Sequence, residues 1–109
     1  MRRGDIYAAA ARGADNNKRR PVAVLQDDRF DSTASVTVVP FTTRDLDAPL
    51  LRIAVQASGT TGLAETSRLV IDKVTTVPRT SLTRQVGRLP DGDLVRFDRA
   101  LLVFLGLAA

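Results

Sequence analysis

Short runs of apolar and β-branched residues, each ended by turn-forming residues, most constrain how this chain can fold. Val22–Leu25 and Val36–Val39 are such runs, and their composition is typical of strands buried on both faces. Residues 51–56 instead alternate large apolar side chains with polar or small ones, as half-buried strands do. Further strands are expected at 4–11, 68–77 and 84–89. About six short strands at close spacing predict a small barrel.

The pattern changes after Pro90, where apolar residues begin to recur at helical intervals. Leu94, Phe97 and Leu101 follow this period, and Asp91 adds favourable charge at a helix start. We therefore expect a C-terminal α-helix of about four to five turns, and a mainly β (α+β) protein. Its end is apolar around much of its circumference, so we expect burial on two sides, either on its own barrel alone or also against a second copy.

Composition limits the fold and the chemistry further. The 109 residues suit one domain, spanning 1–109, with a modest core. The net charge of +4 favours an anionic partner, although a solvated mixed surface would have the same charge. Histidine and cysteine are absent, which excludes thiolate catalysis and most zinc sites. The longest apolar stretch, 100–109, is about half of what a membrane span requires, so we expect a cytoplasmic protein without a membrane segment.

Two strand ends carry the most suggestive side chains. An Arg20-Pro21 step opens one apolar strand, and the pair Thr42-Thr43 closes the next. If these ends meet, a guanidinium and a hydroxyl lie at one spot, where they could stabilise a phosphate in a transition state. RNA would supply its own nucleophile, the 2′-hydroxyl, and no metal would be required. The alternatives are that Arg20 is an exposed strand-flanking cation and Thr42 an ordinary strand residue.

These residues, with the Arg3–Tyr7 segment ahead of them, resemble the MazF/PemK family of toxins. The resemblance covers nearly the whole chain. Its other matching segments are Gln26–Asp28, Pro40–Thr43, Thr61–Leu63, Ser67, Ile71–Val77, Val86–Leu89 and Asp98–Leu101. It implies an SH3-like barrel with a C-terminal helix and the toxin of a type II toxin-antitoxin pair. The implied activity is that of a metal-independent, sequence-specific endoribonuclease on single-stranded RNA, with no cofactor.

The resemblance also implies roles for individual residues. Arg20 would stabilise the phosphorane and Thr42 would orient it. Asp15 would be the general base, although it could equally cap a turn; the loop around it reads Gly-Ala-Asp-Asn where the family more often has Gly-Ser-Glu-Gln. The expected RNA contacts are Arg12, Asn16, Lys18, Arg19, Thr43, Arg44, Ser67, Asp72 and Lys73. Ser67 and Asp72 have structural or base-contacting roles in this interpretation, and the basic loop could alternatively be merely solvated.

The expected partners are RNA, a second copy of the chain and a cognate antitoxin. The antitoxin would lay a disordered, often acidic segment across the basic groove. Two other functions remain open on the sequence. One is a non-catalytic nucleic-acid-binding module of SH3-like fold. The other is a gyrase poison like the CcdB toxins, which end in Trp-Gly-Ile, whereas this chain ends Leu105–Ala109 and contains no tryptophan.

Overall fold

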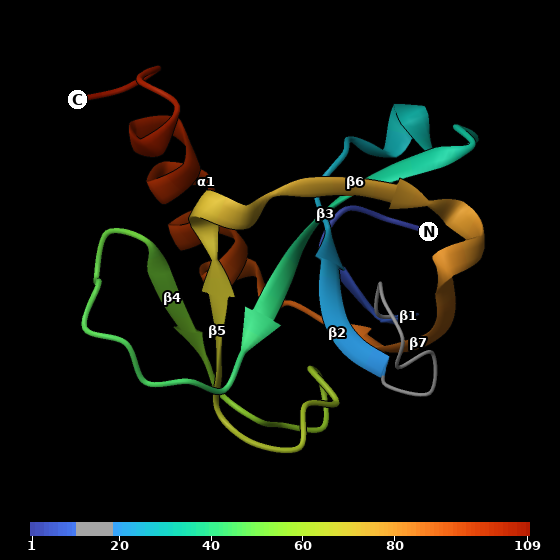
Figure 1. Ribbon diagram of the computed structural model, residues 1–109, viewed down its shortest axis with the longest axis horizontal. Coiled ribbons are helices and arrows are strands. Elements are labelled where there is room, and N and C mark those ends of the chain that lie inside the picture. Colours follow the sequence, from blue (N-terminus) through green and yellow to red (C-terminus); the bar gives the residue numbers. More distant parts are fainter. Residues whose placement is uncertain (11–18) are drawn as a thin grey trace.

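The computed structural model describes residues 1–10 and 19–109. In these ranges seven strands precede one α-helix (Figure 1). The strands are β1 (Asp5–Ala10), β2 (Arg19–Val24), β3 (Ser35–Thr42), β4 (Arg52–Val55), β5 (Ser67–Val70), β6 (Thr75–Pro78) and β7 (Leu82–Arg88), and the helix is α1 (Asp91–Phe104). Three single 3₁₀ turns interrupt them, η1 (Asp28–Phe30), η2 (Ile71–Lys73) and η3 (Arg79–Ser81). The mainly β fold with a closing helix is confirmed.

One predicted strand was wrong. Residues 68–77 form two strands, β5 and β6, separated by the turn η2, so the described chain has seven strands instead of six. Both strands pair with β3, but at different places: β5 pairs at Phe41 and Thr42, whereas β6 pairs along Ser35–Val38. The chain must turn between the two pairings, and it does so where Ile71 is buried.

The strands form an antiparallel sheet in the order β4-β5-β3-β2-β1-β7, with β6 also paired to β3. In the described part of the chain, β4 and β7 lie at the two ends of this order and are not paired with each other. The sheet is therefore open, and the expectation of a barrel is corrected in this respect.

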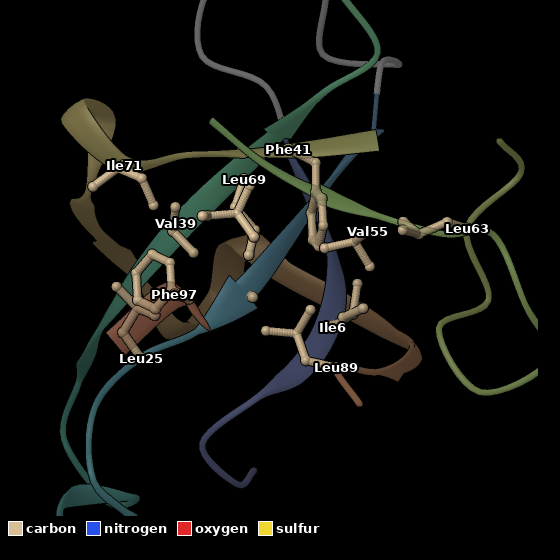
Figure 2. Packing of buried hydrophobic residues seen from close by; sticks show 12 residues of the cluster. Ile6, Leu25, Val39, Phe41, Val55, Leu63, Leu69, Ile71, Leu89 and Phe97 are labelled. Atoms are coloured by element: carbon tan, nitrogen blue, oxygen red, sulfur yellow. The ribbon is translucent and has the colours of Figure 1, made fainter. Parts of the chain in front are cut away.

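Both faces of the central strands are buried, as the sequence predicted. Ala23 of β2 lies opposite Val39 of β3, and on that face the side chains join the main core, which includes Phe97 of α1 (Figure 2). Val22 and Val24 face the other way, into a smaller cluster with Ala9, Val36 and Val38. Since successive side chains of a strand point to opposite faces, both faces of β2 and β3 need apolar residues.

Helix α1 covers the main core with one side. Phe97 is fully buried, and Leu94, Ala100 and Leu101 pack against the same cluster. The other side of its C-terminal half is exposed at Leu102, Val103 and Phe104, and Leu105 directly after the helix is exposed as well. Burial of the helix on two sides was expected, and within this protomer only one of these sides is covered. Neither α1 nor any other helix of residues 1–10 and 19–109 has the length and apolar character to cross a membrane.

Candidate active site

The ends of β2 and β3 bring Arg20 and Thr42 together. In this antiparallel pair Val22 lies opposite Pro40, and the same register continued by two residues sets Arg20 opposite Thr42. Residues opposite each other in an antiparallel pair point to the same face of the sheet. Accordingly, both side chains line one groove of about 360 Å³. The two strand ends therefore meet, as the sequence analysis required for a site formed by both side chains.

The groove has a strongly positive lining. Arg20, Arg44, Arg52 and Lys73 line it, while no carboxylate does so among the described residues. The remaining lining residues are Pro40, Phe41, Thr42, Leu46 and Val70. Four cations around a concave surface raise the local concentration of anions, and guanidinium groups bind phosphate oxygens in a bidentate manner. The groove is therefore suited to a phosphate-bearing ligand.

The two central side chains are available to a ligand. The Oγ1 atom of Thr42 accepts a hydrogen bond from the backbone N–H of Arg44 at 3.2 Å, which leaves the hydroxyl proton free to donate. Arg20 is exposed, and its guanidinium forms no hydrogen bond or ion pair with any residue that the structure describes. Its fork is thus not engaged by neighbouring carboxylates or carbonyls in the described ranges.

The other expected RNA contacts are divided between two sides of the sheet. Arg44 and Lys73 lie in the groove with Arg20. Arg19, Thr43 and Ser67 line a second cavity of about 270 Å³, because neighbouring residues on a strand alternate between faces. Ser67 is buried there and donates its hydroxyl to the carbonyl of Glu65 at 3.0 Å. The remaining expected residues, Arg12, Asp15, Asn16 and Lys18, lie outside the described residues.

Asp72 lies apart from Arg20. It lines a cavity beside α1, together with Leu101 and Phe104. Its Oδ1 atom accepts a hydrogen bond from Nη1 of Arg52 at 2.8 Å, which is also an ion pair. The side chain of Arg52 is only 13% exposed, and it connects Asp72 to the groove that Arg52 itself lines.

Comparison with known proteins decides the family. Residues 2–105 match the family described as PemK-like, MazF-like toxin of type II toxin-antitoxin system. The chain belongs to this family. Over 108 residues it is 70% identical to the probable endoribonuclease MazF of Mycolicibacterium smegmatis, with 99% of each chain covered. The resemblance proposed from the sequence is confirmed.

More distant relatives give the same family and fold. The chain is 31% identical over 116 residues to endoribonuclease MazF9 of Mycobacterium tuberculosis, with 98% of each chain covered. It superposes on the solved structure of the Mycobacterium tuberculosis toxin MazF-mt6 with a TM-score of 0.80 at 25% identity, over 96% of this chain and 99% of that one. The open sheet with its closing helix is thus the MazF toxin fold.

One charged groove residue of this MazF-like chain was missed by sequence reasoning. Arg52 was interpreted only as a polar position of an alternating strand. The available signal was its charge, since it is the one charged residue within 51–56. Its partner Asp72 is 20 residues away, so no local pattern connects the two.

The ion pair between Arg52 and Asp72 predicts a pH dependence of stability. Burial acts to raise the pKa of Asp72, but the hydrogen bonds from Arg52 and from its own backbone, together with the charges of Arg52 and Lys73, lower it below 3.8. A lowered folded-state pKa gives stability that is complete above the unfolded value and is lost as pH falls through the folded one. We expect the melting-temperature difference between wild type and Asp72→Asn to be constant from pH 7 to about 5, and to shrink at pH values below 3.8. A difference that stays constant down to acid unfolding would contradict this.

Proposed function

We propose that this member of the MazF-like toxin family is a metal-independent, sequence-specific endoribonuclease for single-stranded RNA. The observation that carries the proposal is the placement of Arg20 and Thr42 on facing strand ends in a groove lined by cations. The names of its relatives, endoribonuclease MazF9 and probable endoribonuclease MazF, support the same class of activity.

In the proposed mechanism the 2′-hydroxyl of the RNA attacks the neighbouring phosphorus. The bond from O2′ to phosphorus forms, the bond from phosphorus to O5′ breaks, and the O2′ proton passes to a base while the leaving O5′ takes a proton from water. Negative charge accumulates on the non-bridging oxygens, where the fork of Arg20 binds two of them and the Thr42 hydroxyl donates to one. The products are a 2′,3′-cyclic phosphate and a 5′-hydroxyl. Asp15 is proposed as the base.

The chemistry of the groove fits a mechanism without a metal. Magnesium is held in proteins by carboxylate and other oxygen ligands, whereas the charged residues that line this groove, among those described, are all cations. In the proposed reaction Arg20 and its neighbours neutralise the phosphorane directly.

The other proposed RNA contacts extend in two directions from Arg20. Arg44 and Lys73 would bind backbone phosphates within the groove, and Arg19, Thr43 and Ser67 would approach the adjoining nucleotide from the second cavity. Arg12, Asn16 and Lys18 are proposed to add contacts from the loop before Arg19. Asp72 was expected to have either a structural or a base-contacting role, and its ion pair with Arg52 favours the structural role.

The proposal includes protein partners. As a single toxin domain acting on cellular RNA, the chain would act in the cytoplasm and be neutralised by a cognate antitoxin. An acidic segment of the antitoxin would cover the cations of the groove. A homodimer would cover the apolar side of α1 at Leu102, Val103 and Phe104, which is exposed in the protomer.

The decisive experiment is cleavage of a long single-stranded RNA in excess EDTA, with the new ends identified. We expect undiminished cleavage that leaves 5′-hydroxyl ends and cyclic or 3′-phosphate ends. As a control, a 2′-deoxy substitution at the cleavage site is expected to abolish cutting there, because it removes the nucleophile. Cleavage that needs Mg²⁺ and leaves 5′-phosphates would contradict the mechanism. RNA binding without cleavage would instead favour the non-catalytic module, and inhibition of gyrase would favour a CcdB-like poison.

A further inference from the structure

Arg52 occupies an unusual position for a charged residue. It begins β4, lies opposite Val70 of β5, and lines the groove with Arg20 and Lys73. Its side chain is nevertheless only 13% exposed. A guanidinium that is withdrawn this far from water needs hydrogen-bond partners to compensate for lost hydration.

In the described part of the chain, the hydrogen-bond partners of the Arg52 guanidinium lie directly before β4 and within η2. Its Nη1 donates at 2.8 Å both to Oδ1 of Asp72 and to the carbonyl of Leu51. The same Leu51 carbonyl accepts the backbone N–H of Ile71 at 3.0 Å. The first two residues of η2 are thus fixed to the start of β4, one through its backbone and one through its carboxylate.

The third residue of η2 is Lys73, which lines the groove. No hydrogen bond or ion pair holds the Lys73 ammonium among the described residues. The turn η2 also lacks a side-chain cap. The direction in which this long, flexible side chain leaves the backbone is therefore determined by how η2 is held.

We propose that Arg52 is a positioning residue, which holds η2 through Asp72 and so keeps Lys73 in the groove to bind a backbone phosphate of the RNA. This inference rests on the proposed function. Arg52 acts through Lys73, and its own guanidinium stays with Asp72.

The test compares Arg52→Gln, Lys73→Ala and the double variant. Arg96→Gln is the matched control, because Arg96 also donates to a carboxylate at 2.8 Å and to a β4 carbonyl, at 3.2 Å, but does not line the groove. Steady-state cleavage gives kcat and KM. Binding of a random-sequence 2′-O-methyl RNA pool, which lacks the nucleophile, is measured as a function of salt concentration, and the melting temperature of each variant is recorded.

We expect Arg52→Gln to raise KM about tenfold with kcat within about threefold of wild type, since positioning of bound RNA is lost and Arg20 is kept. Loss of one phosphate contact lowers the salt dependence of single-strand binding by about 0.7 in log–log slope. Lys73→Ala, Arg52→Gln and the double variant should all show this one-contact loss. Arg52→Lys, which can still pair with Asp72, should restore most of the binding, and Arg96→Gln should match wild type.

Three results would overturn the inference. If Arg52→Gln lowers only the melting temperature, Arg52 is merely structural. If the double variant loses two contacts, Arg52 binds phosphate itself and does not act through Lys73. If Arg96→Gln changes binding as Arg52→Gln does, the effect is a general loss of charge. If the wild-type protein binds the RNA pool but does not cleave RNA, the proposed function is wrong. The role of Arg52 is then decided by the binding measurements alone.

Discussion

Replacing Arg20 by alanine is expected to lower the rate of RNA cleavage by about a hundredfold or more, because one donor to a developing oxyanion has an effect of that order. The loss should appear in kcat. Stability should hardly change, since the guanidinium is exposed and bonds to no described residue. The measurement is single-turnover cleavage of RNA, together with the melting temperature.

Two variants show whether geometry or charge is responsible. Arg20→Lys keeps the charge but removes the planar fork that can hold two phosphate oxygens, so most of the loss should remain. Arg99→Ala removes the same charge from an exposed position on α1 and should leave kcat unchanged. Cleavage undiminished in Arg20→Ala would place the chemistry elsewhere, and equal losses in Arg20→Ala and Arg99→Ala would indicate a general electrostatic effect.

The central pair of the site could be predicted from the sequence because its signal is local. Arg20 stands at the start of one recognisable strand and Thr42 at the end of the next. Because consecutive strands that pair antiparallel place these two ends side by side, the two residues become neighbours. Arg52 could not be found in this way. Its proposed role depends on an ion pair with Asp72, and that pair exists only because η2 turns back onto the start of β4.

The errors in the predicted fold have a similar origin. The range 68–77 is rich in β-branched residues throughout, and this composition shows that residues are extended without showing which strand they pair with. The change of pairing along β3, from Thr42 and Phe41 for β5 to Ser35–Val38 for β6, is a tertiary property. Closure of the barrel likewise depends on whether β4 meets β7, and no local pattern decides that.

A close backbone contact holds the turn between β4 and β5 against β7. A Cβ atom added at Gly87 would lie 2.2 Å from the carbonyl oxygen of Thr61. Thr61 is fully buried, and its Oγ1 donates to the carbonyl of Gln56 and accepts the N–H of Ser58, both at 3.1 Å. The turn also accepts the N–H of Arg88 at the carbonyl of Thr60, 2.9 Å away. Because backbone held in this way cannot easily move aside, a side chain at position 87 forces the two segments apart.

We therefore expect Gly87→Ala to lower the free energy of unfolding by about 2 to 3 kcal/mol, the upper part of the range for overpacked sites. Gly87 does not have a positive φ, so the loss would report the clash and not backbone strain. The matched control is Gly92→Ala in the first turn of α1, where an added Cβ meets nothing within 4 Å and helix propensity favours alanine by up to about 1 kcal/mol. Urea unfolding of both variants measures the difference. A Gly87→Ala protein as stable as wild type would mean that the turn does not pack on β7. Gly62 of the turn lines the second cavity together with Ser67 and Arg19, so this cavity would then not be closed by the turn.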